Sequence, residues 1–430
     1  MSKLVLVTGA TGYVATRLIP SLLGKGYRVR CLVRSPEKLR NRPWLDKVEV
    51  FVGDVMNEES LFPALKGVQS AYYLIHNMAS GDSYRENERI GAMNFGRAAK
   101  FTNLEHIIFL GGLGGSKENR HMQSRQETGK ILRESGVAVT EFRSSIIIGS
   151  GSISFELIRY LTTWFPFIPA PVQTNQPGQP IGIKDLLAIL IAALDDPRYR
   201  GEIIEIGGPE IIKYPDIMAK FARVRGLNRP IITIPFFPVS LSAWIADKLT
   251  PVPYEIAFPL MQELEAPSIV QVAPEIKGLH DLQSLGPYLN SLQYAIGREE
   301  YGNHLPWLGA LSTRKPLVGT LVRTIGEGFL IEYREMISAS VSNYGKRFLI
   351  GEWEGKWELD DFHPGVWIRV KRNYKMVGKL FLEMQFLDGR FIQSALFEPN
   401  GIIGYLWWYC LVPFHSYHLR KIFERVIEKN

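Results

Sequence analysis

The sequence predicts an α/β protein in which a doubly wound parallel sheet with a small substrate-side lobe precedes a C-terminal α+β domain with an antiparallel sheet. Three observations predict this. Short apolar runs alternate with amphipathic stretches over residues 1–150, a glycine-rich turn follows the first apolar run, and from about residue 326 apolar and polar residues alternate. The first pattern is typical of buried parallel strands separated by helices, and the third is typical of antiparallel strands.

The first 150 residues supply the elements of the parallel sheet. Apolar runs predict strands over residues 4–7, 27–33, 48–53, 70–75, 106–110 and 137–148. The stretches between them predict helices over residues 14–25, 59–66, 84–102 and 123–135, with a short one beginning at 37–40. Because these strands are apolar throughout, we expect helices on both faces of the sheet. Right-handed crossovers then give the doubly wound order.

The pattern loosens after residue 153 and changes again near residue 326. A proline-rich stretch leads to an apolar helix over 183–194, a strand over 202–206 and a helix over 215–225. Alternation then predicts strands over 329–342, 357–358, 366–374, 379–387 and 390–397, closed by an amphipathic helix over 416–429. We therefore expect a domain of residues 1–300, with its core in 1–150 and its lobe mainly in 151–182 and 210–300. A second domain should comprise residues 301–430.

Composition excludes several classes of protein. The chain has 430 residues, 46% of them hydrophobic and 22% charged, which is ordinary for a folded globular protein. The net charge of +7 is spread along the chain without a run of five or six basic residues, so we expect no nucleic-acid binding. Two cysteines make no disulfide framework, and the N-terminus lacks a signal-peptide pattern, so we expect a cytoplasmic protein.

The apolar stretches are too short to cross a membrane. None reaches 18 uncharged apolar residues, so we expect no spanning segment. The nearest candidate is the stretch 401–414, which is rich in aromatic residues. Two interpretations of it stay open, the buried start of a helix and a peripheral contact with a membrane surface.

A glycine-rich turn joins the first predicted strand to the first helix. Gly9 permits a tight turn, Gly12 lets the backbone approach a pyrophosphate, and Ala15 allows the helix to pack closely on the strand. The N-terminus of the helix favours the negative charge of the pyrophosphate. With a strand before it, a helix after it and a second strand at the right distance, this turn predicts a Rossmann dinucleotide-binding unit.

The end of the second strand distinguishes between the two nicotinamide cofactors. NAD sites usually carry an acidic residue there, whereas residues 30–35 contain none and Arg34 falls where a 2′-phosphate would lie. Asp54, after the third strand, could accept a hydrogen bond from the adenine amino group or simply cap the strand end. We therefore expect NADP(H), with an ordinary surface arginine as the alternative interpretation of Arg34.

Together these residues resemble the atypical short-chain dehydrogenase/reductase superfamily, and within it the NmrA-like and complex-I-associated NAD(P)-binding subgroup. The resemblance covers residues 1–225 and rests on the glycine turn, on Arg34 and on the segments 53–55 and 207–209. Residues 397–415 resemble a domain of uncharacterised function that follows such a unit in some bacterial proteins. For the cofactor, the resemblance implies a site formed by Gly9, Thr11, Gly12, Tyr13, Val14, Arg34, Asp54, Val55, Ile75, His76, Gly111 and Arg125.

The resemblance also implies a catalytic Ser, Tyr and Lys, and the sequence departs from it at all three. Glycine stands at the Ser position after residue 110, while His121 and Arg125 align with the Tyr and the Lys. Arg125 keeps its proton, so it can bind a ribose or a phosphate but cannot act as a base. His121 can move a proton near neutral pH, unless it is merely a polar residue at a helix start. His121 and Arg125 are thus the candidate catalytic residues.

Three further polar residues follow the fourth strand and are weaker candidates: His76, Asn77 and Tyr84. No metal-ligand spacing appears. Three functions are compatible with these residues. The first is an NADP-dependent oxidoreductase or isomerase acting on a small apolar substrate. The second is a non-catalytic NADP(H)-binding redox sensor or assembly factor, favoured by the altered triad. The third is a hydrophobic-ligand binder that uses the C-terminal domain, although a helix packed on that sheet to bury a core is the simpler interpretation.

Overall fold

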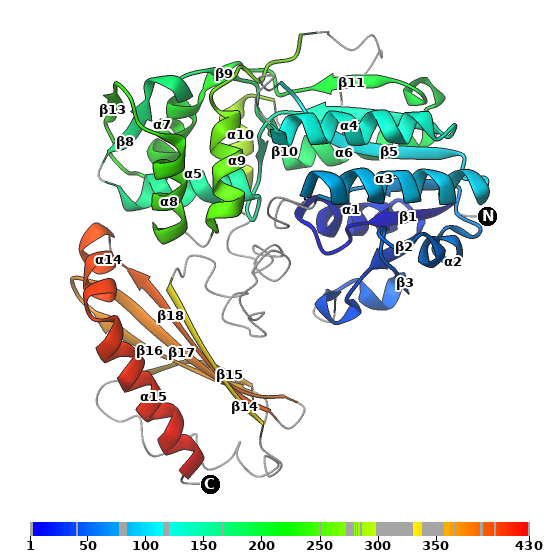
Figure 1. The fold of residues 1–430 in the computed structure, drawn as a ribbon. Coiled ribbons are helices and arrows are strands. Elements are labelled where there is room, and N and C mark those ends of the chain that lie inside the picture. The colour runs from blue at the N-terminus through cyan, green and yellow to red at the C-terminus, as the bar shows by residue number, and fades with distance from the viewer. Residues whose placement is uncertain are drawn as a thin grey trace. The chain divides into compact units, whose positions relative to one another are not determined.

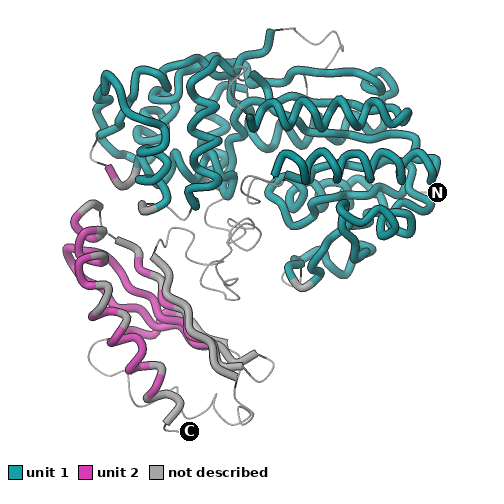
Figure 2. Tube along the Cα trace, in the orientation of Figure 1, with its two compact units in different colours: residues 1–162, 167–297, 306–313 teal, residues 163–166, 298–305, 314–430 magenta. Residues whose placement is uncertain are grey.

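In this computed structural model, the residues whose structure is described are 3–39, 42–76, 84–114, 120–165, 167–249, 252–271, 279, 281, 283, 286–297, 330–337, 357–363, 367–387, 390–399 and 401–428. The chain divides into two compact units (Figure 2). The first comprises residues 1–162, 167–297 and 306–313, and the second comprises residues 163–166, 298–305 and 314–430. The predicted boundary between residues 300 and 301 lies outside the described residues.

A seven-stranded parallel sheet forms the centre of the first unit, in the order β11-β6-β5-β4-β1-β2-β3. Its strands are β1 (Leu4–Thr8), β2 (Arg28–Val33), β3 (Glu49–Val52), β4 (Ser70–Tyr73), β5 (His106–Gly112), β6 (Ala138–Ser144) and β11 (Ile203–Ile206). The order runs outward from β1 to β3 on one side and from β4 to β6 on the other. The reversal lies between β1 and β4, where doubly wound sheets bind their ligands. The predicted α/β fold is confirmed.

Helices cover both faces of this sheet (Figure 1). Helices α1 (Tyr13–Gly24) and α6 (Ile183–Asp195) pack on one face, while α2 (Leu61–Leu65), α3 (Tyr84–Phe101) and α4 (Arg120–Glu134) pack on the other. In β1, Val5 points into the first core and Leu6 into the second, and both are fully buried. Because successive side chains of a strand point into two different apolar cores, these strands are apolar throughout. Short 3-10 turns occupy Pro36–Leu39, Leu45–Lys47, Glu58–Ser60 and Pro197–Tyr199.

Most of the remaining elements of the first unit form the lobe beside the sheet. Its helices are α5 (Ile153–Trp164), α7 (Tyr214–Val224), α8 (Val239–Leu249), α9 (Tyr254–Glu263) and α10 (Tyr288–Gly297), with a 3-10 turn at Val172–Thr174. Short strands pair beside them: β7 (Ile147–Ile148) with β10 (Ile181–Gly182), β12 (Ile212–Lys213) with β9 (Pro177–Gly178), and β13 (Ile231–Ile234) with β8 (Ile168–Pro171). A separate core around Phe155, Phe221 and Leu292 holds the lobe together.

The predicted strand over 137–148 is the clearest departure from the sequence analysis. Strand β6 ends at Ser144, and Ile147–Ile148 then pairs with β10 in a different sheet. The chain leaves the central sheet here because it turns across the edge that carries the cavity described below, which Ser144 and Ser145 both line. Helix α4 also begins earlier than predicted, at Arg120 rather than at residue 123, so that His121 and Arg125 lie on its first two turns.

The second unit contains a five-stranded antiparallel sheet, as predicted, in the order β14-β18-β17-β16-β15. The strands are β14 (Leu330–Ile337), β15 (Glu358–His363), β16 (Trp367–Tyr374), β17 (Gly378–Leu387) and β18 (Arg390–Pro399), followed by α14 (Gly401–Cys410) and α15 (Val412–Glu428). Trp408 and Leu419 pack from these two helices on Leu382 and Phe397 of the sheet, which buries an apolar core. No helix among the described residues is both long and apolar enough to span a membrane.

Candidate functional site

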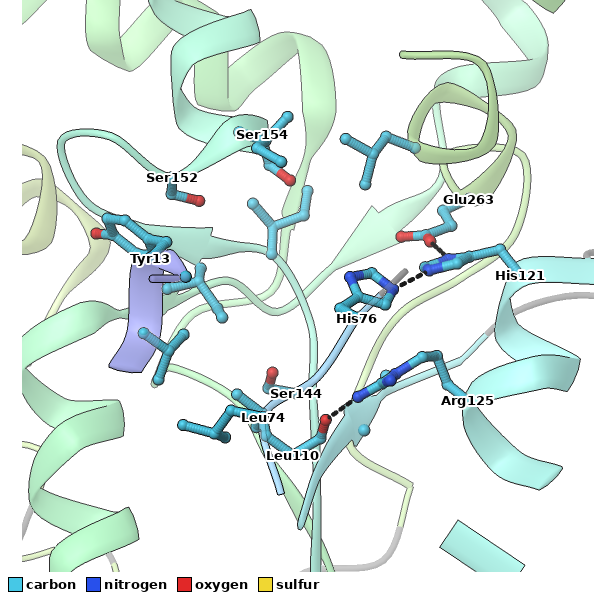
Figure 3. A pocket seen from close by; sticks show the side chains of 18 of the residues that line it. Tyr13, Leu74, His76, Leu110, His121, Arg125, Ser144, Ser152, Ser154 and Glu263 are labelled. Carbon is cyan, nitrogen blue, oxygen red and sulfur yellow. Dashed lines mark hydrogen bonds and ion pairs between the residues drawn. The ribbon is translucent and has the colours of Figure 1, made fainter. Parts of the chain in front are cut away.

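A cavity of about 800 Å³ opens at the carboxyl edge of the central sheet, where the strand order reverses (Figure 3). The ends of β1, β2, β4, β5 and β6 line one side of it, and residues of α5, α7 and α9 line the other. All twelve residues predicted to hold the cofactor lie in its wall, and so does His121. Asn77 lies outside the described residues, and Tyr84 is absent from the cavity wall.

The glycine turn supplies a cradle at the start of helix α1. Gly9 has a φ of +62°, and a Cβ there would lie 2.8 Å from the carbonyl oxygen of Leu74. The amide of Gly12 donates to the carbonyl oxygen of Gly9 at 2.8 Å, and Gly12 then caps the helix without a side chain. No acidic residue occupies the first turn of α1. The N-terminus of the helix therefore presents uncovered backbone amides to the cavity, which fits the pyrophosphate of a dinucleotide.

A pair of cations lines the cavity beyond the end of β2. These are Arg34 and Lys38, which are separated in sequence by Ser35, Pro36 and Glu37, of which Ser35 also lines the cavity. The Arg34 side chain is 68% exposed, and its Nη1 lies 4.0 Å from Oδ2 of Asp54. Oδ1 of Asp54 accepts the backbone amide of Met56 at 3.0 Å. Asp54 thus caps its own turn, as one interpretation predicted, while its second carboxylate oxygen remains in the cavity wall.

Two histidines and a glutamate form a continuous hydrogen-bonded chain across the cavity wall (Figure 3). His76 follows β4, His121 lies in the first turn of α4, and Glu263 ends α9. Nε2 of His76 lies 2.6 Å from Nε2 of His121. Nδ1 of His121 is paired with Oε1 of Glu263. Burial of His76 among protein atoms, together with the positive charges of Arg125 and His121, lowers the pKa of its imidazole well below the usual value.

Arg125 is held by the ends of the strands beside the cavity. Its Nη1 donates to the carbonyl oxygen of Ile75 at 3.0 Å, and its Nη2 donates to that of Leu110 at 2.6 Å. Nη1 also lies 3.4 Å from a carboxylate oxygen of Glu88, whose other oxygen accepts from Ser124 at 2.6 Å. The guanidinium therefore joins β4, β5 and α3, which gives Arg125 a structural role in addition to its place in the cavity wall.

Sequence reasoning missed Glu263 completely. It lies 142 positions from His121, on a helix of the lobe, and no local motif marks it. The lobe also contributes apolar side chains to the wall: Ile153, Leu157, Ile217, Leu260 and Met261. Among the described residues, no group of three or more His, Cys, Asp and Glu side chains is arranged to hold a metal ion.

Comparison with known proteins identifies relatives of the first unit. Residues 9–147 match the model of a family described as NAD(P)H-binding. A (4-alkanoyl-5-oxo-2,5-dihydrofuran-3-yl)methyl phosphate reductase of Streptomyces griseus is 28% identical over 237 residues, which cover 53% of this chain and 75% of that protein. A photosystem II assembly factor of Cyanophora paradoxa is 32% identical over 148 residues, covering 32% of this chain and 44% of that factor.

Solved structures share the fold. An NADPH-dependent quinone oxidoreductase of Escherichia coli, complexed with NADPH, has a TM-score of 0.54 and 18% identity, with 68% of this chain and 99% of that one covered. A triphenylmethane reductase of Citrobacter, complexed with NADP(H), has a TM-score of 0.52 and 17% identity, with 69% and 100% covered. Residues 9–147 of this chain thus match an NAD(P)H-binding family, and the fold of the first unit is shared with these solved structures.

Proposed function

We propose that this protein binds NADP(H) in the cavity at the carboxyl edge of its sheet and reduces a small, largely apolar substrate with it. The observation that carries the choice of NADP(H) is the pair of cations, Arg34 and Lys38, in the wall beyond β2. A guanidinium can form two parallel hydrogen bonds to a phosphate, and an ammonium adds a second charge. The sequence offers no carboxylate from residue 30 to residue 36 that would bind a free 2′-hydroxyl instead.

The rest of the cavity fits the remaining parts of the cofactor. The uncovered amides at the start of α1 would bind the pyrophosphate, and the second carboxylate oxygen of Asp54 would accept from the adenine amino group. When bound, the cofactor supplies a hydride from its nicotinamide ring. His121 stands where the resemblance implies the catalytic Tyr, and His76 lies beside it at the end of β4.

Apolar lobe residues support the substrate class. Leu157, Ile217 and Met261 line the wall that faces the sheet edge, and Ser152 and Ser154 are polar groups among them. Pockets of this composition bind small molecules by apolar burial and orient them with a few polar contacts. Reduction of a carbonyl, an enone or a quinone needs such a dry wall and one proton donor, which the histidines can supply.

A non-catalytic NADP(H)-binding function is the second candidate. It is favoured by the position of Arg125, which stands where the resemblance implies a lysine and instead holds the carbonyl groups of Ile75 and Leu110. A relative in photosystem II assembly is named as an assembly factor and not as an enzyme.

One experiment separates the two candidates. The protein is mixed with NADPH and a panel of aldehydes, ketones, enones and quinones, and oxidation of NADPH is followed by its absorbance. Turnover with at least one acceptor is expected for a reductase. Saturable binding of NADPH without oxidation by any acceptor would favour the sensor or assembly function, and absence of binding would contradict both.

A further inference from the structure

The chain Glu263–His121–His76 links the lobe to the cavity through atoms that can exchange protons. Each contact joins one ring nitrogen to the next group: the Glu263 carboxylate to Nδ1 of His121, and Nε2 of His121 to Nε2 of His76. His121 is 6% exposed and Glu263 is 22% exposed at the side chain. His76 lies among many protein atoms in the cavity wall, although part of its surface stays open to the cavity, and its Nδ1 has no hydrogen-bond partner among the described residues. All three residues line the cavity, with Glu263 on the lobe side and His76 at the end of the central sheet.

The contact between the two Nε2 atoms restricts where protons can lie. At 2.6 Å, one proton must stand between the two nitrogens, because two bare or two protonated nitrogens would repel. When His121 is an imidazolium, it donates from Nδ1 to Glu263 and from Nε2 to His76, so a neutral His76 carries its proton on Nδ1. When these three side chains together have lost one proton, both histidines are neutral. His76 then carries its proton on Nε2 and donates it to Nε2 of His121.

The surrounding charges disfavour a second proton on His76. Arg125 on α4 and His121 both lower the pKa of His76. Glu263 on α9 lies against His121, and Glu88 on α3 is occupied by Ser124 and Arg125. Of the two histidines, His121 is the one that contacts a carboxylate, that of Glu263.

We propose that Glu263, His121 and His76 form a proton relay that protonates the substrate from Nδ1 of His76, with His76 as the catalytic acid and the other two as positioning residues. This inference rests on the proposed function, in which a hydride reaches the carbon of a polarised C=O or C=C bond. The electron pair of that bond moves to the oxygen, directly or through conjugation, and takes the proton from Nδ1 of His76. Nε2 of His76 takes the proton from Nε2 of His121, which leaves His121 neutral. Solvent then returns one proton, so each turnover consumes one hydride and one proton.

The relay predicts a signature that needs neither cofactor nor turnover. Nitrogen-15 labelling of the eight histidines reports which ring nitrogen carries the proton, and the signals of His76 and His121 are assigned with His76→Gln and His121→Gln variants. As the pH rises, His76 should change from the Nδ1–H form to the Nε2–H form at the pH where His121 loses its charge. His76 should stay neutral throughout. A His76 that keeps one form over the whole range, or that becomes charged itself, would overturn the proposal.

A variant of Glu263 separates a relay from mere packing. Glu263→Gln keeps the shape and an acceptor oxygen but removes the charge that stabilises the imidazolium of His121. The change of form in His76 should then occur at a lower pH, because an anion beside His121 has been removed. Glu255→Gln is the matched control, because Glu255 is an exposed residue at the start of the same helix, and it should leave the transition in place. An unchanged transition in Glu263→Gln would contradict the assigned role of that residue.

Measurements of NADPH binding and of acceptor reduction distinguish a failure of the relay from a failure of the proposed function. At saturating NADPH, His76→Phe should reduce an active acceptor at least about 100-fold more slowly than the wild type, the lower end of what a general acid contributes. Wild-type protein that binds no NADPH contradicts the proposed function, whatever the histidine spectra show. Wild-type turnover that His76→Phe leaves intact contradicts the relay and leaves the proposed function standing.

Discussion

Nη2 of Arg125 donates to the carbonyl oxygen of Leu110 at 2.6 Å, while Nη1 of the same guanidinium donates to the carbonyl oxygen of Ile75 at 3.0 Å. One side chain thus holds two neighbouring strand ends at the reversal of the sheet. Its charge is balanced by Glu88, and the two side chains are 7% and 2% exposed. At the position where the resemblance implies a catalytic lysine, this chain carries a buried structural ion pair.

Arg125→Ala should lower the free energy of unfolding by about 3–5 kcal/mol, because it leaves the Glu88 carboxylate buried without its cation. Denaturant unfolding of the first unit measures the change. Arg89→Ala is the control: Arg89 pairs with Glu86 on the same helix as Glu88, but these side chains are 41% and 56% exposed. An exposed pair contributes less than about 1 kcal/mol. Equal losses in the two variants would refute the structural role.

Gly9→Ala should abolish cofactor binding and lower the free energy of unfolding by about 1–3 kcal/mol. The reason is geometric: φ at Gly9 is +62°, and the added Cβ would lie 2.8 Å from the Leu74 carbonyl oxygen. Gly24→Ala at the end of α1 is the matched control, since nothing lies within 4 Å of its added Cβ. We expect Gly24→Ala to bind NADPH normally. Calorimetric titration of both variants is the measurement, and normal binding by Gly9→Ala would exclude the turn as the pyrophosphate site.

Local patterns were sufficient to predict which residues meet at the edge of the sheet. The glycine turn, Arg34 and Asp54 lie in short segments at the ends of consecutive strands, and parallel strands bring such ends to one edge. The twelve predicted residues accordingly meet in one wall. Alternation was equally sufficient for the C-terminal sheet, because apolar side chains at alternate positions of β16, β17 and β18 pack against α14 and α15.

The features of the site that the sequence did not reveal depend on contacts between residues far apart in the chain. The pairing of His121 with Glu263 depends on how the lobe folds back over the sheet edge, and no spacing rule links positions 142 residues apart. The carbonyl partners of Arg125 are equally invisible, because backbone atoms carry no sequence signal. The break after Ser144 had no marker either, since Ile147 and Ile148 continue an apolar run in a different sheet.

The stability of the first unit should decline as the pH falls from about 6.5 to 4, in part through His106. Burial and the nearby charge of Arg200 lower the pKa of His106 to about 4. The hydroxyl of Thr140 donates to the carbonyl oxygen of Tyr199, so Nε2–H of His106 donates to Thr140 Oγ1 at 2.7 Å and the buried Nδ1 stays bare. In this window the unfolded chain binds a proton that the folded chain does not, so the free energy of unfolding falls by up to about 1.4 kcal/mol per pH unit.

His106→Gln isolates this contribution, because the amide can still donate to Thr140 but does not titrate. The free energies of unfolding of wild type and variant are compared between pH 8 and pH 4. The difference between the two free energies of unfolding should be constant above about pH 7. Below about pH 6.5 the wild type should lose stability relative to the variant. A difference that does not depend on pH would contradict the assignment of a neutral buried histidine.

The central claim is that this protein binds NADP(H), and calorimetric titration of NADPH and NADH into wild type and Arg34→Ala tests it most directly. Arg28→Ala, at the opposite end of β2, is the control, because Arg28 pairs with Glu49 and does not line the cavity. We expect wild type and Arg28→Ala to prefer NADPH. Arg34→Ala should lose about 10- to 100-fold in affinity for NADPH and change little for NADH. Equal losses for the two cofactors, or binding of neither by the wild type, would contradict the account.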